Sequence, residues 1–366
     1  MRIGVVGCGD ISDIYLQNMI EKFNNIEVVA CCAGHFENAR RKAEQYGICA
    51  CSYEELLQDS SIEMVVVLTP APTHYELIRQ ALEAGKHVYT EKTMTVGLKE
   101  AKELLELADR KGLYLGAAPD TFLGSALQTA RKAIDEGVIG EVTSFHIAAN
   151  RNLDILAGFA KYMRMPGGGI CFDYGVYYLT ALVSLLGPVE QVSAVVKNRS
   201  KVRINQIPDS PEYGQQYLYP NESQTAAVIQ MENGIIGDFL LNGDSILKDL
   251  ADFTIYGTKG VLKLADPNQF GGKIVLISDS HDWSAENEVI VLENIFAYSE
   301  NSRGIGPAEM ADAIQSGRKN RANKEMAYHV LDTICRMMDS SESGAFVKVE
   351  STCERPEAFA GGGSLM

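Results

Sequence analysis

Two pairs of polar side chains, far apart in the chain, have the types needed for proton transfer. Glu91 and Lys92 follow the apolar run Lys86–Tyr89, at the mouth of an expected buried strand. Charges there are unfavourable unless they bind each other or a ligand; a structural ion pair is the alternative, and the position favours function. Asp173 and Tyr177 are four residues apart in an apolar helical pattern, so both project from one face. The tyrosine alone is equally typical of a core, but a buried carboxylate needs a partner.

A glycine turn opens the chain in the sequence RIGVVGCGDIS. A short apolar strand, two glycines and an amphipathic helix follow one another, which is the context that makes the pattern specific. Gly7 permits the tight turn, Gly9 lets the backbone approach a pyrophosphate, and the helix start offers N–H groups to the anion. A turn that merely tolerates glycine is the alternative. The context favours dinucleotide binding, with contacts expected from Gly7, Cys8, Gly9, Asp10, Ile11 and the small residue Ser12.

The choice between NAD and NADP depends on the end of the second strand. An acidic residue normally binds the ribose 2′-hydroxyl there, but Ala33 and Gly34 occupy this place. A 2′-phosphate would therefore meet no repulsion, and His35, Arg40 and Arg41 offer positive charge nearby. The two arginines are also typical of a solvated helix face. The sequence favours NADP over NAD.

Strands and helices alternate through residues 1–120. This predicts a parallel sheet covered on both faces, with ligands at the carboxyl ends of its strands. Thr69 and Pro70 form a turn at such an end, and His74 opens the next helix, so all three are expected to contact the cofactor, as is Glu91. Apolar runs give the strands Ile3–Val6, Ile26–Cys32, Glu63–Leu68, Lys86–Tyr89 and Leu113–Ala117, and helical patterns lie at Glu37–Tyr46, Tyr53–Gln58, His74–Glu83 and Lys99–Lys111.

Three motifs in this order, GCGDIS, LTPAPTH and AGKHVYTEK, resemble the glucose–fructose oxidoreductase/inositol dehydrogenase (Gfo/Idh/MocA) family. The family's last motif is usually EKP with a catalytic lysine, so the resemblance implies that Lys92 is catalytic and contacts the cofactor. Thr93 replaces the proline, which leaves the loop geometry open. A second motif is also similar, because three glycines at 167–169 precede Asp173, Gly175 and Tyr177. Tyr177 stands at the family's histidine position, where some members use tyrosine as the acid/base.

The resemblance implies hydride transfer between NAD or NADP and a secondary hydroxyl of a sugar, polyol or glycoside. Tyr177 would be the acid/base, Lys92 would lower its pKa, and Asp173 would hold Lys92 or a substrate hydroxyl. Two alternatives stay open: a redox-assisted glycosidase or lyase that recycles its cofactor, for example through 3-oxidation of a glycoside, and a non-catalytic dinucleotide-binding regulator. No metal ligand spacing is present. Substrate contacts are expected from Tyr177, Asp120, Asn150, Arg151 and Arg164, which adjoin the motifs, and Arg303 is a further cleft candidate.

The second half of the chain is expected to be an α+β domain with a large open, mainly antiparallel sheet. Its apolar runs alternate after residue 190, with turn signals such as Asn233-Gly234 between them. Residues 198–222 are polar and proline-containing, which predicts a mobile loop or a lid. The tail 358–366 is expected to be disordered or used in assembly. The division is therefore a Rossmann domain at 1–120 and a substrate-binding and oligomerisation domain at 121–366.

Composition narrows the class of protein. The 366 residues exceed one ordinary core. The net charge of −15 argues against nucleic-acid or anionic-membrane partners. Eight cysteines without zinc-type spacing favour reduced thiols, and neither a leader nor a long apolar run is evident, which predicts a cytoplasmic protein. The open sheet predicts a homo-oligomer, a dimer or a tetramer.

Overall fold

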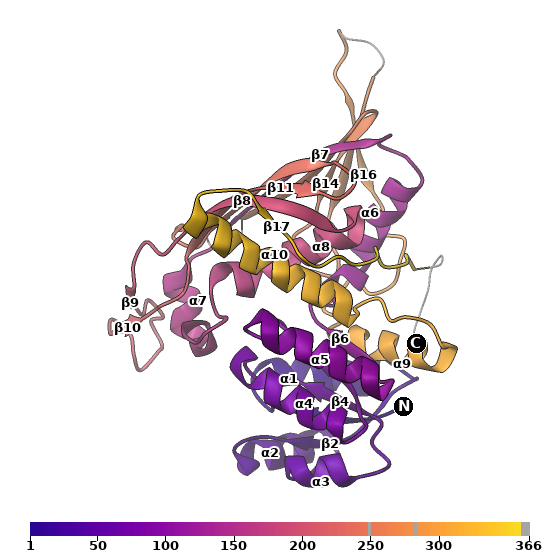
Figure 1. Cartoon of the computed structure of the whole chain (residues 1–366), viewed down its shortest axis with the longest axis vertical. Coiled ribbons are helices and arrows are strands. Elements are labelled where there is room, and N and C mark those ends of the chain that lie inside the picture. The colour runs from indigo at the N-terminus through magenta and orange to yellow at the C-terminus, as the bar shows by residue number, and fades with distance from the viewer. Residues whose placement is uncertain (248–249, 281–283, 360–366) are drawn as a thin grey trace.

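The computed structural model describes residues 1–247, 250–280 and 284–359. Within them the chain folds into two main sheets, one near each end of the molecule, and a small two-stranded one (Figure 1). The first sheet is parallel, in the order β3-β2-β1-β4-β5-β6. Its strands are β1 Arg2–Val6, β2 Glu27–Cys32, β3 Cys49–Ala50, β4 Met64–Val67, β5 His87–Thr90 and β6 Leu115–Ala117. Its helices are α1 Ile11–Glu21, α2 Phe36–Tyr46, α3 Tyr53–Gln58, α4 His74–Glu83 and α5 Leu98–Lys111, with a 3₁₀ turn at Ala71–Thr73.

The predicted parallel sheet is confirmed. All four residues of β4, MVVV, are buried, as expected of a central strand covered on both faces. One strand was not predicted, the edge strand β3, because two residues carry no readable periodicity. The order places the carboxyl ends of β1, β4 and β5 side by side, and the glycine turn, Thr69 and Lys92 follow these three strands.

The second sheet is large and mainly antiparallel, as predicted. Among the described residues its order is β16-β15-β14-β13-β7-β12-β11-β8-β17, and all its pairs are antiparallel except β7 with β12. The strands are β7 Val142–Asn150, β8 Val189–Lys197, β11 Gln224–Met231, β12 Ile236–Asn242, β13 Leu250–Gly257, β14 Gly260–Leu264, β15 Ile274–Ser278, β16 Glu288–Leu292 and β17 Val347–Lys348. The helices of this half are α6 Ser125–Asp135, α7 Leu153–Phe159, α8 Val176–Leu186, α9 Ile305–Ser316 and α10 Lys324–Ser343, with 3₁₀ turns at Thr121–Leu123 and Lys161–Arg164.

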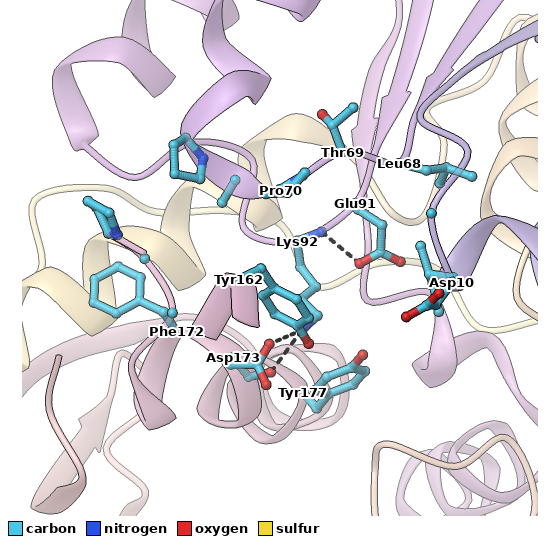
Figure 2. A pocket seen from close by; sticks show the side chains of 17 residues that line it. Asp10, Leu68, Thr69, Pro70, Glu91, Lys92, Tyr162, Phe172, Asp173 and Tyr177 are labelled. Carbon is cyan, nitrogen blue, oxygen red and sulfur yellow. Dashed lines mark hydrogen bonds and ion pairs between the residues drawn. The ribbon is translucent and has the colours of Figure 1, made fainter. Parts of the chain in front are cut away.

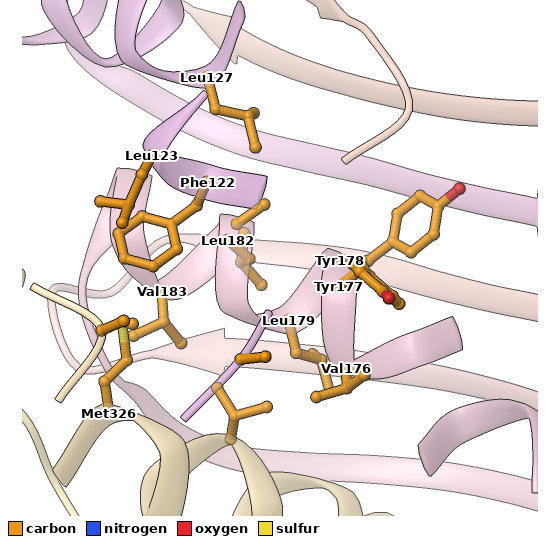
Figure 3. Close-up of a cluster of buried hydrophobic side chains, with 14 of the residues drawn as sticks. Phe122, Leu123, Leu127, Val176, Tyr177, Tyr178, Leu179, Leu182, Val183 and Met326 are labelled. Carbon is orange, nitrogen blue, oxygen red and sulfur yellow. The ribbon is translucent and has the colours of Figure 1, made fainter. Parts of the chain in front are cut away.

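Helix α8 is the centre of the second half. Every residue from Val176 to Leu186 is buried, so the helix is apolar on all sides, as a helix enclosed by other elements must be. Its side chains pack against Phe122, Leu123 and Leu127 and against Met326 of α10 (Figure 3). A π-helical turn, Cys171–Gly175, runs directly into α8. Asp173 and Tyr177 therefore stand on a rigid, fully packed element.

The chain after residue 300 returns to the first sheet. Ala117 N–H donates to the carbonyl of Ala322, and Lys324 pairs with Asp109 at the end of α5. Helix α10 also binds the large sheet, since Ser340 Oγ accepts from Ala194 N–H of β8. Figure 1 shows α10 lying between α5 and the large sheet. This return fixes the two halves against each other.

Residues 198–222 differ from the expected loop or lid. Within them β9 Val202–Ile204 pairs antiparallel with β10 Gln216–Leu218. The buried Arg203 anchors this hairpin by ion pairs to Asp154 at 3.0 Å and Asp244 at 2.8 Å. Polar, proline-containing sequence concealed the hairpin because its strands are only three residues long. Of the tail 358–366, residues 360–366 lie outside the described part of the chain.

Candidate active site

A cavity of about 250 Å³ lies where the carboxyl ends of the parallel strands face the start of α8. Figure 2 shows its side chains, which come from the glycine turn, the ends of β4 and β5, and the segment before α8. Segments from both halves of the chain thus form one wall. The lining residues are Gly9, Asp10, Ile11, Leu68, Thr69, Pro70, Ala71, Pro72, Glu91, Lys92, Tyr162, Pro166, Gly167, Gly168, Phe172, Asp173 and Tyr177.

The glycine turn fits a dinucleotide. Gly7 has φ +106°, and a Cβ there would lie 2.8 Å from the carbonyl carbon of Leu68, so only glycine is accommodated. A Cβ on Gly9 would meet no described atom within 4 Å, which leaves its cavity side open for a phosphate. Ser12 Oγ donates to Gly9 O at 2.6 Å and braces the turn, and the Cys8 thiol donates to the carbonyl of Cys32. Ile11, the first residue of α1, also lines the cavity, so the start of this helix lies at the same place.

Lys92 and Asp173 form a buried ion pair across the cavity. Lys92 Nζ lies 2.5 Å from Asp173 Oδ1 and also donates to the Asp173 main-chain carbonyl at 3.2 Å (Figure 2). Their side chains are 11% and 7% exposed. Burial alone would lower the pKa of Lys92, but Asp173, with Tyr177, Tyr162 and Glu91, raises this pKa well above its usual value. Lys92 is therefore a fixed ammonium group.

Two cationic side chains lie close to Tyr177. Lys92 Nζ lies 5.3 Å from the centre of its ring, and Arg303 Nη2 donates to its hydroxyl at 3.4 Å. Burial raises the pKa of Tyr177, while Lys92 and Arg303 lower it, and the net result is a pKa above its ordinary value. The expected lowering by Lys92 exists but is outweighed. The hydroxyl therefore carries its proton near neutrality.

Glu91 and His74 brace the loop that bears Lys92. Glu91 accepts hydrogen bonds from Tyr15 Oη at 2.7 Å and from Lys92 N–H at 3.2 Å. The buried His74 ring lies between two carbonyls, with Nδ1 2.7 Å from Thr93 O and Nε2 2.6 Å from Thr69 O. Burial lowers the pKa of His74, and these hydrogen bonds oppose that effect. The Lys92–Thr93 peptide bond is cis. Thus His74 joins the turn after β4 to the loop after β5.

The residues expected to select the cofactor lie at the rim of the first sheet. Ala33 is half-buried, and Gly34 and His35 are exposed at the start of α2. Arg40 pairs with Glu37 at 2.6 Å and Glu44 at 3.6 Å on the exposed face of that helix. Its charge is therefore partly neutralised by its own helix.

The expected substrate residues occupy different environments. Asp120 is buried and accepts from the N–H groups of Gly304 and Gly306, each at 3.1 Å, which places it behind Arg303. Burial raises its pKa to about 6, while Arg303 lowers it. Arg151 pairs with Asp266 at 2.8 Å and stacks on Tyr174, and Asn150 accepts from Asn242. Arg164 donates to Ala157 O and stacks on the ring of Tyr217. None of these four belongs to the described cavity lining.

Sequence reasoning did not single out Tyr162 or Phe172, which line the cavity. Tyr162 projects from the 3₁₀ turn Lys161–Arg164, and Lys92 Nζ lies 5.9 Å from the centre of its ring. Aromatic residues on either side of the glycine run were the available signal, but aromatics are more often core. Among the described residues, moreover, no group of His, Cys, Asp and Glu is arranged to hold a metal ion.

The fold and the cavity define a class: proteins in which a glycine turn at the carboxyl end of a parallel sheet shares one cavity with polar side chains from the half that carries a large, mainly antiparallel sheet. Residues 1–118 match the family described as "Oxidoreductase family, NAD-binding Rossmann fold", and residues 127–263 match the "GFO/IDH/MocA C-terminal domain". The chain therefore belongs to the Gfo/Idh/MocA family of oxidoreductases, which confirms the resemblance of its motifs.

Individual relatives are more distant. The chain is 34% identical over 204 residues to a dTDP-3,4-didehydro-2,6-dideoxy-alpha-D-glucose 3-reductase of Actinomadura kijaniata, covering 54% of this chain and 60% of that protein. It is 26% identical to a trans-1,2-dihydrobenzene-1,2-diol dehydrogenase of Bos taurus, covering 73% and 75%. The chain spans about half the length of the curated relatives it matches, 42% and 58% for two of them. Levoglucosan dehydrogenase in complex with NADH and levoglucosan shares the fold, with a TM-score of 0.82, 18% identity and coverage of 96% and 100%.

Proposed function

We propose that this protein is an NAD(P)-dependent oxidoreductase that interconverts a secondary hydroxyl and a ketone on a neutral sugar, polyol or glycoside. The observation that carries the proposal is the approach of Lys92, Asp173 and Tyr177 to one another in a cavity that begins at the glycine turn. The three residues come from the two halves of the chain, and relatives are named as a 3-reductase of a dTDP-linked didehydro sugar and as a diol dehydrogenase.

The cofactor would be held by the glycine turn and the start of α1, and it would supply a hydride acceptor or donor. Tyr177 Oη would hold the proton that a carbonyl receives or a hydroxyl loses. Lys92, kept charged by Asp173, would polarise the substrate oxygen. Because Tyr177 is protonated near neutrality, its acid form is ready for ketone reduction, whereas alcohol oxidation requires its deprotonation.

The charge balance favours a neutral substrate. Lys92 is balanced by Asp173, and Arg303 faces the partly ionised Asp120. Glu91 adds a carboxylate to the cavity wall. An anionic substrate would therefore meet no excess positive charge among the described residues of the cavity, whereas polyol hydroxyls can pair with either sign.

The proposed cofactor is NADP, with NAD as the competing possibility. What supports NADP is the missing carboxylate at Ala33 and Gly34, while the pairing of Arg40 with Glu37 and Glu44 weakens the contribution of that arginine. The ratio of kcat/KM for NADP over NAD, measured with one polyol, decides between the two cofactors.

We also propose a cytoplasmic homo-oligomer, a dimer or a tetramer, assembled through the open face of the large sheet. Val195 and Leu240 lie opposite Ala226 on the neighbouring strands β8 and β12, and they are 57% and 41% exposed. Light scattering should give a multiple of 40.0 kDa, and the double variant Val195→Lys/Leu240→Lys should give the monomer mass. Among the described residues the helices all fall short of the length and apolarity that crossing a bilayer requires, and the eight cysteines are free thiols.

The deciding experiment for the reaction is absorbance at 340 nm with NADP or NAD and a panel of sugars, polyols and glycosides. We expect net cofactor reduction with at least one cyclic polyol. Product formation without an absorbance change would instead point to a recycled cofactor, and dinucleotide binding without any turnover would point to a regulator.

A further inference from the structure

The carboxylate of Glu222 lies directly beneath the turn that presents Asp173, although no motif points to it. Glu222 ends the hairpin segment 198–222 and precedes β11. Its Oε1 accepts a hydrogen bond from Cys171 N–H at 3.0 Å, and its main-chain carbonyl accepts from Ile170 N–H at 3.2 Å. These two N–H groups open the π-helical turn that continues into α8. They would otherwise lack partners, as the first N–H groups of any helix do.

The glycine run is explained by the same contact. A Cβ on Gly169 would lie 1.9 Å from Oε2 of Glu222, so the carboxylate fills the space that a side chain would need. A Cβ on Gly168 would lie 2.5 Å from the Met163 backbone on the other side. Close approach, rather than a turn conformation alone, therefore requires glycine at 168 and 169.

Two residues close to Glu222 in sequence form hydrogen bonds to the rest of this cavity wall. Tyr219 Oη lies 3.3 Å from Gly168 O, within donating distance, and Asn221 Nδ2 donates to Met163 O at 2.9 Å and to Met165 O at 2.7 Å. The opposite side of this wall faces the cavity through Pro166, Gly167 and Gly168. The end of the hairpin segment therefore supports the cavity wall from behind and is not a lid over the cavity.

The charge of Glu222 is sensitive to its surroundings. Burial raises its pKa to about 7, Asp173 adds to that rise, and the N–H groups of the turn oppose it. The ionisable groups that face it are Asp173 and Cys171 on the turn and Tyr219 on its own segment. The pKa values of the Cys171 thiol and the Tyr219 phenol are raised, so both groups are neutral near pH 7. Asp173 is therefore the charge that faces Glu222.

We propose that Glu222 is a positioning residue for the acid–base centre: by accepting the N–H groups at the start of the turn, it fixes where Asp173 holds Lys92. The inference rests on the proposed function for its kinetic consequence. Its structural part, the contact of Glu222 with Gly169 and Cys171, stands separately.

The kinetic test uses ketone reduction between pH 5 and 9, where the acid form of Tyr177 is available throughout. Glu222→Gln keeps an acceptor oxygen but cannot ionise, so kcat should stay within about threefold of wild type and lose any pH dependence near 7. Glu222→Ala should lower kcat about tenfold or more with little change in KM. Gly169→Ala should lower kcat by a similar factor. The double variant Gly169→Ala/Glu222→Ala should lose less activity than the product of the two single-variant factors, because the added methyl group at position 169 enters the space that the Glu222 carboxylate has left.

A second readout does not depend on turnover. The pKa of Glu222 is higher in the folded chain than its ordinary value of about 4.5, so wild type loses stability as pH rises from there through about 7. Glu222→Gln should therefore melt above wild type at pH 8, and the gap should close towards pH 4.5. Glu212→Gln is the matched control, because Glu212 lies on the same segment but pairs with Lys161 at the surface.

The outcomes separate the two proposals. Wild-type protein that reduces no ketone would refute the proposed function, while the melting curves would still test the Glu222 contact. Wild-type kcat in both Gly169→Ala and Glu222→Ala would overturn the positioning role. A melting difference between Glu222→Gln and wild type that does not change with pH would contradict the buried carboxylate contact on which the positioning role depends.

Discussion

Arg303 Nη2 lies 3.4 Å from the hydroxyl oxygen of Tyr177, although 126 positions separate the two residues. The same nitrogen donates to Asn268 Oδ1 at 2.9 Å, which fixes the guanidinium group. Asp120 holds the backbone beyond it through the N–H groups of Gly304 and Gly306. Tyr177 thus has one cation at its hydroxyl and another, Lys92, over its ring. Arg303 therefore contacts the phenol hydroxyl directly, whereas Lys92 lies over the ring.

Tyr177→Phe removes the proposed proton donor. We expect kcat/KM to fall about 100-fold or more, the usual contribution of general acid–base catalysis, with unchanged dinucleotide affinity. Steady-state kinetics and fluorescence titration measure the two effects. Tyr174→Phe, three positions away on the turn and stacked on Arg151, is the matched control and should retain turnover. Comparable losses in both variants would contradict the assignment.

Lys92→Met leaves Asp173 buried without its cation. Breaking a buried pair by removing one partner costs about 3–5 kcal/mol of unfolding free energy. Denaturant unfolding should show this loss, and Lys92→Met/Asp173→Asn should recover part of it while staying inactive. Lys161→Met breaks the surface pair with Glu212 and should cost at most about 1 kcal/mol. A Lys92→Met variant as stable as wild type would argue against the pair.

Arg303→Gln removes one of the two cations that lower the pKa of Tyr177. That pKa should rise further, because burial is then opposed by Lys92 alone. The alcohol oxidation rate at pH 8 should fall about tenfold, while ketone reduction at pH 6 should change less. Two complete pH profiles measure this difference. Equal losses in both directions would indicate damage to the fold or to substrate binding instead.

Alcohol oxidation by the wild type should accelerate with pH. The pKa of Tyr177 lies above its ordinary value, so the base form is a minor fraction near neutrality. Between pH 7 and 9, kcat/KM for oxidation should rise about tenfold per pH unit, whereas kcat/KM for reduction should stay nearly flat. A plateau in oxidation below pH 8 would show that another group acts as the base.

Ala33→Asp introduces the carboxylate that NAD-dependent relatives of this fold use at the ribose. The ratio of kcat/KM for NADP over NAD should fall about tenfold or more, because the introduced carboxylate would repel a 2′-phosphate. Arg40→Ala is the comparison, and it should shift the ratio less, since Glu37 and Glu44 already hold that arginine. A larger shift from Arg40→Ala would reverse this ranking.

Local patterns in the sequence were sufficient for the first half of the fold. Strands and helices alternate there with short connections, so residues that are neighbours in sequence are also neighbours in space. The glycine turn is likewise recognised from a few consecutive residues. The same holds for α8, because the apolar helical pattern that contains Asp173 and Tyr177 predicts a helix there. The family motifs further identified Lys92, Asp173 and Tyr177 as a set.

Only the tertiary structure brought Tyr162 and Glu222 to that set, and only the structure placed Arg303, a cleft candidate in the sequence, at the Tyr177 hydroxyl. Each lies on a short turn or a polar segment without periodicity. Each is brought to the site by the packing of segments that are distant in sequence, which no local pattern encodes. The structure also decided protonation: burial outweighs two nearby cations at Tyr177, whereas Asp173 and its acidic neighbours together outweigh burial at Lys92. The sequence specifies which residue types are present. The dielectric surroundings of these residues and the distances between their charges are set only when distant segments pack together.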